Sequence, residues 1–189
     1  QAHLGKQGTP NMGGILIASA VVVSALAYAL YHGIAWRLLP ILLTSLGCMA
    51  VGFADDYIKV VQKEHEGLKP KQKVFGQVLV GLIFSLFCYF AVGSRILLPF
   101  TKATWDLGLF YVPLMTVLVV FMTNSANIQD GADGLLSSVT VVGAVAMGII
   151  AMLLDNQVAP RDGAASAGML FALAGACIGF LRYNHHPAQ

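Results

Sequence analysis

The chain has 189 residues, of which 57% are hydrophobic and 11% are charged, and its formal net charge is +2. An ordinary soluble domain carries about 25% charged residues, and a chain of this length cannot bury so much apolar surface in one aqueous core. The composition therefore argues against a soluble globular enzyme, a disordered chain, a disulfide-stapled secreted domain or a nucleic-acid-binding protein, and it indicates an integral membrane protein.

Six stretches without charged residues predict six transmembrane helices. Each stretch can hold the roughly 20 apolar residues that span a bilayer as a helix. We do not expect strands, because the apolar runs are continuous rather than alternating and a membrane forbids open sheet edges. The sequence predicts an all-α integral membrane protein, a polytopic helical bundle that forms a single transmembrane domain over residues 1–189, with helices near 14–36, 38–54, 74–94, 107–129, 134–154 and 163–181.

Lysine and arginine are unevenly distributed between the two ends of these helices. The N-terminal segment, the loops at 54–73 and 124–136 and the C-terminal tail together carry 7 of them, whereas the opposite loops carry 4. The positive-inside rule places the first set in the cytoplasm. Four polar sequences then share the cytoplasmic side, where a single site could collect them: residues 5–14, 55–73, 124–134 and 184–189.

The first polar sequence, residues 3–14, is rich in glycine and leads into a helix. Backbone N–H groups in such a stretch, together with the ammonium of Lys6 and the hydroxyl of Thr9, can bind a phosphate. The spacing is not that of a Walker A loop. By spacing alone, an ordinary N-terminal loop is the simpler interpretation.

The second polar sequence places two adjacent carboxylates, Asp55 and Asp56, at the end of an apolar helix. Neighbouring carboxylates repel each other unless a cation neutralises them, and hard oxygen ligands suit Mg²⁺. Lys59 follows Asp55 by four residues and shares its helical face if the helix continues. The competing interpretation is a polar helix end at the water interface.

The third polar sequence, residues 124–135, has two asparagines and two aspartates between apolar helices: Asn124, Asn127, Asp130 and Asp133. Gly131 and Gly134 allow tight turns and the close approach of a ligand. The spacing and the residue types exclude an EF-hand loop. We favour a functional segment over a simple polar turn, which could be built from fewer such residues.

The fourth polar sequence, residues 184–189, contains the adjacent histidines His185 and His186. Adjacent side chains point in different directions on a helix, and no other metal ligands lie near them in the sequence. We therefore do not assign them to a metal site.

Taken together, the four segments resemble the polyprenyl-phosphate N-acetylhexosamine-1-phosphate transferases. Four motifs occur in order along the chain: His-x-x-Lys-x-Gly-Thr-Pro-x-Met-Gly-Gly at 3–14, Asp-Asp-Tyr-x-Lys at 55–59, Asn-x-x-Asn-x-x-Asp-Gly-x-Asp-Gly-Leu at 124–135 and Asn-x-x-Pro-Ala-Gln at 184–189. Asn11 stands where a threonine is common in the family. The family's following Phe-Met-Gly-Asp sequence, whose aspartate binds magnesium, and its later histidine cluster are absent, so we expect an internal fragment that is inactive alone.

The resemblance implies a Mg²⁺-dependent transfer of phospho-MurNAc-pentapeptide from UDP-MurNAc-pentapeptide to undecaprenyl phosphate. The products would be UMP and lipid I, the first lipid intermediate of peptidoglycan synthesis. Because one substrate is a membrane lipid and the other a cytoplasmic nucleotide, we expect the enzyme in the bacterial inner membrane with its site on the cytoplasmic side. The family also suggests a homodimer.

The same resemblance assigns roles to single residues. Asp55, Asp56 and Asp130 are the candidate catalytic residues, with Asp55 as the base or orienter for the lipid phosphate and with Asp56 and Asp130 also as magnesium ligands. Lys59 is assigned to a phosphate and Asn127 to the diphosphate. The other candidate substrate-binding residues are Lys6, Thr9, Asn11, Asn124, Asp133 and Asn184, of which Lys6, Asp133 and Asn184 resemble contacts to the nucleoside.

Two alternatives are left open. A related transferase that uses UDP-GlcNAc would share the membrane body, although the glycine-rich stretch at 6–14 argues against it. A channel or transporter without catalytic activity would need polar residues along a path through the helices, whereas the acids here cluster at the cytoplasmic ends.

Overall fold

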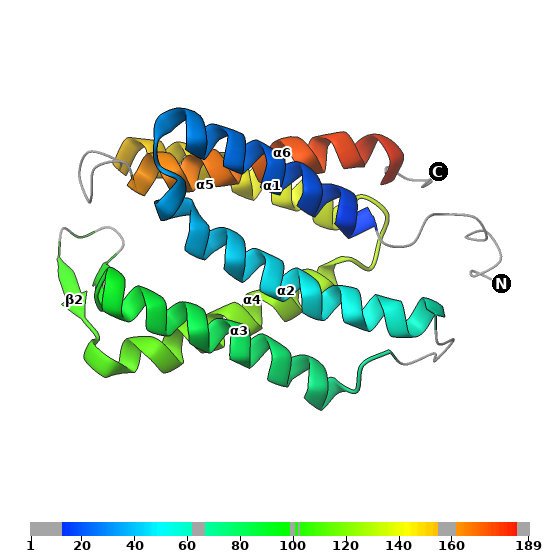
Figure 1. Cartoon of the computed structure of the whole chain (residues 1–189), viewed down its shortest axis with the longest axis horizontal. Coiled ribbons are helices and arrows are strands. Elements are labelled where there is room, and N and C mark those ends of the chain that lie inside the picture. The colour runs from blue at the N-terminus through cyan, green and yellow to red at the C-terminus, as the bar shows by residue number, and fades with distance from the viewer. Residues whose placement is uncertain (1–12, 62–66, 99–100, 102, 155–161, 185–189) are drawn as a thin grey trace. The chain divides into compact units, whose positions relative to one another are not determined.

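The computed structural model describes residues 13–61, 67–98, 101, 103–154 and 162–184 (Figure 1). This part of the chain contains six helices that are long and apolar enough to cross a membrane, which confirms the predicted helical membrane fold. Their bounds are α1 (Gly13–His32), α2 (Ala35–Val61), α3 (Pro70–Ala91), α4 (Tyr111–Gln129), α5 (Leu135–Leu154) and α6 (Asp162–Asn184).

The boundary between the first two helices lies at a glycine and not at Arg37, where the charge pattern placed it. Gly33 adopts a φ of +66°, and its N–H donates to the carbonyl of Leu30. The N–H of Ile34 donates to the carbonyl of Ala29 at 2.9 Å. These two bonds form a Schellman motif, which ends a helix with a left-handed residue. Arg37 therefore lies inside α2, with its guanidinium 4.9 Å from the centroid of the Trp36 ring.

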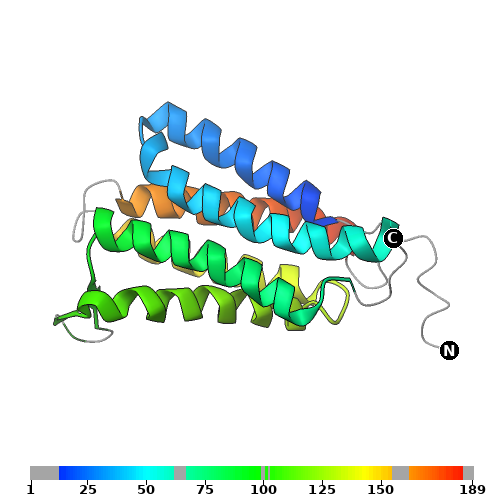
Figure 2. The same ribbon diagram turned by 60° about the horizontal axis from the view of Figure 1, so that its bottom comes forward.

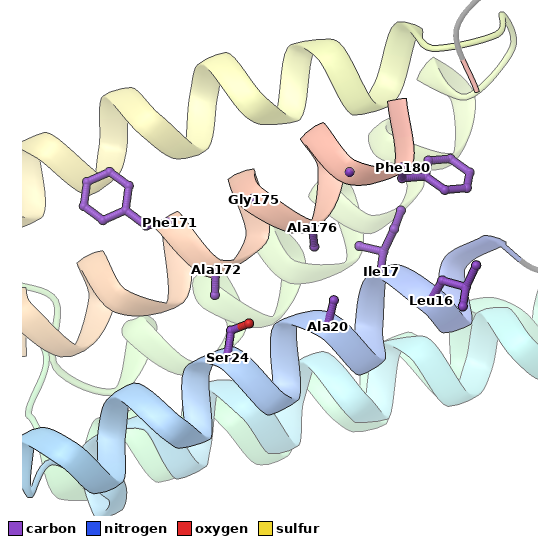
Figure 3. A pocket seen from close by; sticks show the side chains of 10 residues that line it. Leu16, Ile17, Ala20, Ser24, Phe171, Ala172, Gly175, Ala176 and Phe180 are labelled. Carbon is purple, nitrogen blue, oxygen red and sulfur yellow. The ribbon is translucent and has the colours of Figure 1, made fainter. Parts of the chain in front are cut away.

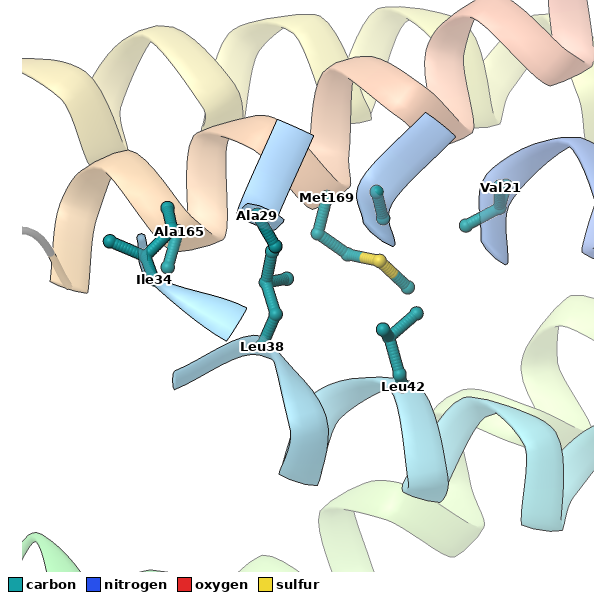
Figure 4. Close-up of a cluster of buried hydrophobic side chains, with 8 residues drawn as sticks. Val21, Ala29, Ile34, Leu38, Leu42, Ala165 and Met169 are labelled. Carbon is teal, nitrogen blue, oxygen red and sulfur yellow. The ribbon is translucent and has the colours of Figure 1, made fainter. Parts of the chain in front are cut away.

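Two compact units divide the chain, and each is described by itself. In the first unit, Gln1–Leu42 and Ala126–Gln189, α6 packs along both α5 and α1. Figure 4 shows its apolar core, in which Met169 of α6 reaches toward α1 and the beginning of α2. The prediction that residues 1–189 form a single transmembrane domain stays a prediction. The buried core residues are Val21, Ala25, Ala29, Ile34, Leu38, Leu42, Ala165 and Met169.

Small residues set the helix spacing in the first unit. A Cβ at Gly168 would collide with the ring of Tyr28 on α1, and a Cβ at Gly148 would lie 2.9 Å from the ring of Phe171. A Cβ at Gly143 or Gly175, by contrast, would meet nothing within 4 Å in the described structure. Close packing thus uses only some of the glycines.

A groove of about 560 Å³ lies between α1 and α6 (Figure 3). Its lining is apolar apart from the hydroxyl of Ser24, so it offers no charged group for chemistry. The lining residues are Leu16, Ile17, Ala20, Ser24, Phe171, Ala172, Gly175, Ala176, Gly179 and Phe180.

In the second unit, Leu43–Ser125, α3 packs against α2 and α4 (Figure 2). Against α2, a Cβ at Gly76 of α3 would lie 2.9 Å from the side chain of Val51. Against α4, Ser85 Oγ and Thr116 Oγ1 share a buried hydrogen bond of 2.8 Å. Small and polar residues of this kind allow membrane helices to approach closely.

A short hairpin joins α3 to α4, although the apolar runs of the sequence predict no strands. The strands β1 (Arg95–Leu97) and β2 (Thr104–Asp106) pair antiparallel, with Arg95 opposite Asp106. Hydrogen bonds from the Ser94 hydroxyl and the Gly108 N–H, together with Arg95, hold the pKa of the Asp106 carboxyl below its ordinary value. The rule against strands holds for the membrane interior, whereas this segment lies between two spanning helices.

Candidate functional site

The carboxylate of Asp55 is the centre of a buried ionic cluster in the second unit. Asp55 is only 5% exposed. Its Oδ2 accepts hydrogen bonds from Lys59 Nζ at 2.7 Å and from Lys73 Nζ at 3.5 Å. Its Oδ1 accepts the backbone N–H of Leu68 at 2.9 Å. Both carboxylate oxygens are therefore engaged, one of them by two ammonium groups.

The local sequence explains how this cluster forms. Because α2 continues to Val61, Lys59 lies one turn beyond Asp55 on the same helical face, as predicted. Gly67 has a φ of +63°, and a Cβ there would lie 2.6 Å from Asp55 Oδ1. Glycine is therefore the residue that lets the loop approach the carboxylate. One turn into α3, Lys73 completes the cluster.

Asp56 is in a different environment from its neighbour. Its side chain is 54% exposed, and Oδ1 lies 3.9 Å from Lys59 Nζ. A carboxylate so exposed can take a cation or a substrate group, whereas the lysines around Asp55 repel a cation. Among the residues that the structure describes, no group of three or more His, Cys, Asp or Glu residues could hold a metal ion.

Asn124 is held between two acceptors at the end of α4. Its Nδ2 donates to Gln77 Oε1 on α3 at 2.7 Å and to the carbonyl of Val120 at 2.8 Å. Gln77 is 1% exposed. The α3 helix thus contacts the aspartate motif (residues 55–59) through Lys73 and the asparagine motif (residues 124–135) through Gln77.

The rest of the asparagine motif spans the end of α4 and the turn before α5. Asn127 and Asp130 are exposed, and Asp133 is half-buried in the turn. Gly134 has a φ of +75°, and its carbonyl accepts the N–H and the hydroxyl of Ser138 in the first turn of α5. Of the two glycines expected to shape the turn, Gly134 requires the left-handed conformation, whereas Gly131 is not among the positive-φ glycines.

The other predicted residues are placed only in part. Asn184 is the last residue of α6 and half-buried. Lys6, Thr9 and Asn11 lie outside the described residues. The structure places the Asp55 and Asn124 contacts in the second unit, and Asn127, Asp130, Asp133 and Asn184 belong to the first.

Sequence reasoning missed three residues of this site. Gly67, Lys73 and Gln77 lie outside the recognised motifs, and the charge count used Lys73 only for the orientation of the chain. A four-residue spacing from Lys73 to Gln77 places both on one face of α3, which was the available signal. Their partners, Asp55 and Asn124, lie 18 and 47 residues away in the sequence.

The described residues form a polytopic membrane protein with six apolar helices. Its polar site is the cluster of Asp55, Lys59 and Lys73 at the end of α2. A family model described as glycosyl transferase family 4 matches residues 38–189, and the chain belongs to this family.

Curated relatives match the whole chain. It is 41% identical over 190 residues to the phospho-N-acetylmuramoyl-pentapeptide-transferase of Thermoanaerobacter sp. (strain X514). It is 39% identical over 189 residues to the protein of that name from Caldicellulosiruptor bescii, and 38% identical over 191 residues to the one from Bacillus pumilus. All of the chain is covered in each case, and it spans 56% to 57% of the length of these relatives.

Proposed function

We propose that this chain forms part of an enzyme that transfers phospho-MurNAc-pentapeptide from UDP-MurNAc-pentapeptide to undecaprenyl phosphate, with lipid I and UMP as products. The names of the relatives support this reaction, and the apolar helices suit an enzyme with a lipid substrate. We place the enzyme in the bacterial inner membrane, with its site on the cytoplasmic side and with a homodimer as its assembly.

The cluster around Asp55 is the observation that carries the proposal. The ammonium groups of Lys59 and Lys73 both contact the Asp55 carboxylate at the end of an apolar helix, and the exposed carboxylate of Asp56 lies 3.9 Å from Lys59. Lys59 has a 41% exposed side chain and three N–H donors, of which Asp55 takes one. Its remaining N–H donors can bind a substrate phosphate, which lowers the mutual repulsion of the two substrates.

In this proposal Asp55 orients lysines and does not act as a strong base. Its oxygens already accept hydrogen bonds from Lys59, Lys73 and Leu68. A phosphate monoester has a second pKa of about 6, so the lipid phosphate is largely ionised at pH 7 and requires little proton removal. These contacts therefore favour Asp55 as the residue that orients Lys59 and Lys73.

The reaction then proceeds by direct displacement. An oxygen of the lipid phosphate forms a bond to the phosphorus on the sugar side of the diphosphate. The bond from that phosphorus to the bridging oxygen breaks, and UMP leaves with the electron pair. Because both oxygens of Asp55 are engaged, an aspartyl-phosphate at this residue is disfavoured. A phospho-aspartate trapped at Asp55 in a quenched reaction would overturn direct displacement.

The exposed carboxylate of Asp56 suits Mg²⁺, which commonly binds one or two carboxylates and substrate phosphates. We propose Asp56 and Asp130 as its ligands and exclude Asp55, because both of its oxygens already accept hydrogen bonds from Lys59, Lys73 and Leu68. When bound, the ion would supply positive charge that offsets the negative charge of the diphosphate. Lys59 then donates to a phosphate, Asn127 binds near the diphosphate, and Lys6, Thr9, Asn11, Asp133 and Asn184 contact the nucleotide substrate.

UMP release by the full-length protein tests this function. With undecaprenyl phosphate and Mg²⁺, we expect UMP from UDP-MurNAc-pentapeptide and no lipid-linked product from UDP-GlcNAc when the two compete. The relatives' names favour the first substrate. A preference for UDP-GlcNAc would establish the rival transferase instead, and absence of UMP release with either nucleotide would leave a protein without this catalytic activity.

The variant Asp55→Asn tests the site. We expect kcat to fall by about 100-fold, with a much smaller change in KM, because the lysines lose their carboxylate partner. Asp106→Asn is the matched control, since Asp106 also pairs with a basic residue, Arg95, but lies in the exposed hairpin. Wild-type turnover in Asp55→Asn, or equal losses in both variants, would remove Asp55 from the mechanism.

A further inference from the structure

The amide of Asn124 is fixed in one orientation by its own helix. Its Nδ2 lies 2.8 Å from the carbonyl of Val120, one turn earlier in α4. A backbone carbonyl can only accept a hydrogen bond, so the nitrogen and not the oxygen of Asn124 faces it. The orientation of the Asn124 amide therefore follows from the backbone of α4.

Gln77 binds the second N–H of the same amide. Its Oε1 lies 2.7 Å from Asn124 Nδ2, and because that nitrogen only donates, the oxygen of Gln77 must face it. An asparagine amide has two N–H donors, and Val120 and Gln77 accept both of them. The atom of Asn124 left for a ligand is Oδ1, which can only accept.

The burial of Gln77 makes this contact strong. A glutamine amide that is 1% exposed is costly to bury unless it is hydrogen-bonded. Its partner Asn124 belongs to the motif that the proposed function assigns to substrate binding. The preceding turn of α3 carries Lys73, which contacts Asp55, so Gln77 lies one helical turn from the ionic cluster.

We propose that Gln77 is a positioning residue that makes Asn124 a pure hydrogen-bond acceptor toward the nucleotide substrate. The group that Asn124 receives is then an O–H or N–H donor, as on a ribose or a uracil ring, and not a phosphate oxygen. This inference rests on the proposed function and deepens it. Removing the Gln77 oxygen frees one N–H of Asn124 and lets the amide turn.

The test compares two α3 variants in the full-length protein. Gln77→Leu removes the acceptor, and we expect the KM for UDP-MurNAc-pentapeptide to rise about fivefold, as the loss of one hydrogen bond implies. The KM for undecaprenyl phosphate and kcat change less than twofold. Ser85→Ala is the matched control, because Ser85 also bonds to α4 through a buried contact but reaches Thr116 and not the asparagine motif.

A merely structural role for Gln77 predicts a different result. Both variants would then lower the melting temperature and change KM in parallel, and that outcome overturns the proposal. An unchanged nucleotide KM in Gln77→Leu overturns it too. If Gln77→Leu does not fold, Gln77→Glu decides, because a carboxyl oxygen offers an acceptor whether or not the group is protonated. Its nucleotide KM should stay within twofold of the wild type, and a fivefold rise overturns the proposal.

The failure of the proposed function can be told apart from the failure of this inference. If the wild-type protein releases no UMP, the function fails and KM has no meaning. UDP binding, measured by calorimetry, then replaces KM as the readout. The inference expects weaker binding in Gln77→Leu than in Ser85→Ala, and equal affinities overturn it.

Discussion

At the scale of single residues, Gly67 controls how closely the loop before α3 approaches Asp55. It combines a φ of +63° with a position where a Cβ would lie 2.6 Å from Asp55 Oδ1 and 3.0 Å from the Asp55 carbonyl oxygen. A left-handed conformation disfavours a Cβ by about 1–2 kcal/mol, and the collision adds to this. In Gly67→Ala, we expect a lower melting temperature and a 10- to 100-fold loss, roughly, of UMP release, because Leu68 and Lys59 shift.

Gly33→Ala is the control for the backbone conformation. Gly33 has a φ of +66°, but a Cβ there meets nothing within 4 Å. The Gly33→Ala variant should lose about 1–2 kcal/mol of stability and keep the rate of UMP release of the wild type. If Gly67→Ala and Gly33→Ala behave alike, the contact with Asp55 has no role in the reaction.

Contacts within this site could be predicted from the sequence only where the relevant spacing is local. Asp55 and Lys59 lie four residues apart on one helix, so their pairing could be predicted from helical geometry. Lys73 and Gln77 act through partners on other helices, and no periodicity shows which helices are neighbours. The requirement for glycine at position 67 depends on the path of a loop, which hydropathy does not describe.

At the scale of secondary-structure elements, hydropathy located the six helices but not their ends. The predicted helix at 38–54 is longer in the structure, where α2 covers Ala35–Val61 and includes both Asp55 and Lys59. A charged residue ends the apolar stretch, but the helix ends where the backbone hydrogen bonds end. The hairpin at Arg95–Asp106 was missed because its strands have three residues each.

Two glycines of α6 give opposite predictions. Gly168 faces the ring of Tyr28 on α1, whereas Gly175 lies beside the open groove between the same helices (Figure 3). Gly168→Ala should destabilise the protein by about 1–3 kcal/mol, because the methyl group forces α1 and α6 apart. Gly175→Ala should be neutral or stabilise it by about 0.5–1 kcal/mol, because alanine favours the helix.

Thermal unfolding of both variants in one detergent provides the measurement. A loss in Gly168→Ala together with no loss in Gly175→Ala is expected. Equal losses in the two variants would contradict the packing of α1 on α6, and a stable Gly168→Ala would place Tyr28 elsewhere.

At the scale of the whole molecule, the proposed chemistry requires the polar motifs to face one aqueous compartment. The aspartate motif belongs to one compact unit, and Asn127, Asp130 and Asp133 belong to the other. If the six apolar helices of the described residues all cross the membrane, the loops after α2 and α4 face one side and the loops after α1, α3 and α5 face the other. The uneven distribution of lysine and arginine, 7 against 4, predicts that the first side is cytoplasmic.

Cysteine labelling tests this orientation. The three native cysteines, Cys48, Cys88 and Cys177, lie in helices and are replaced by alanine in the background protein. Single cysteines are then introduced as Tyr57→Cys, Gly131→Cys and Trp105→Cys, all at exposed positions. A membrane-impermeant maleimide added to cells with a permeabilised outer envelope should label only the Trp105→Cys protein. After the inner membrane is opened, it should label all three.

Each outcome of the labelling bears on a different part of the proposal. If the positions at 57 and 131 are labelled from opposite sides, Asp56 and Asp130 cannot bind one magnesium ion, and the transfer reaction loses its site. If both are labelled from outside, they share a compartment but not the one that holds UDP-MurNAc-pentapeptide. Labelling of both from the cytoplasm, with Trp105→Cys reacting from outside, is the single pattern that lets a cytoplasmic nucleotide and a membrane lipid meet at these carboxylates.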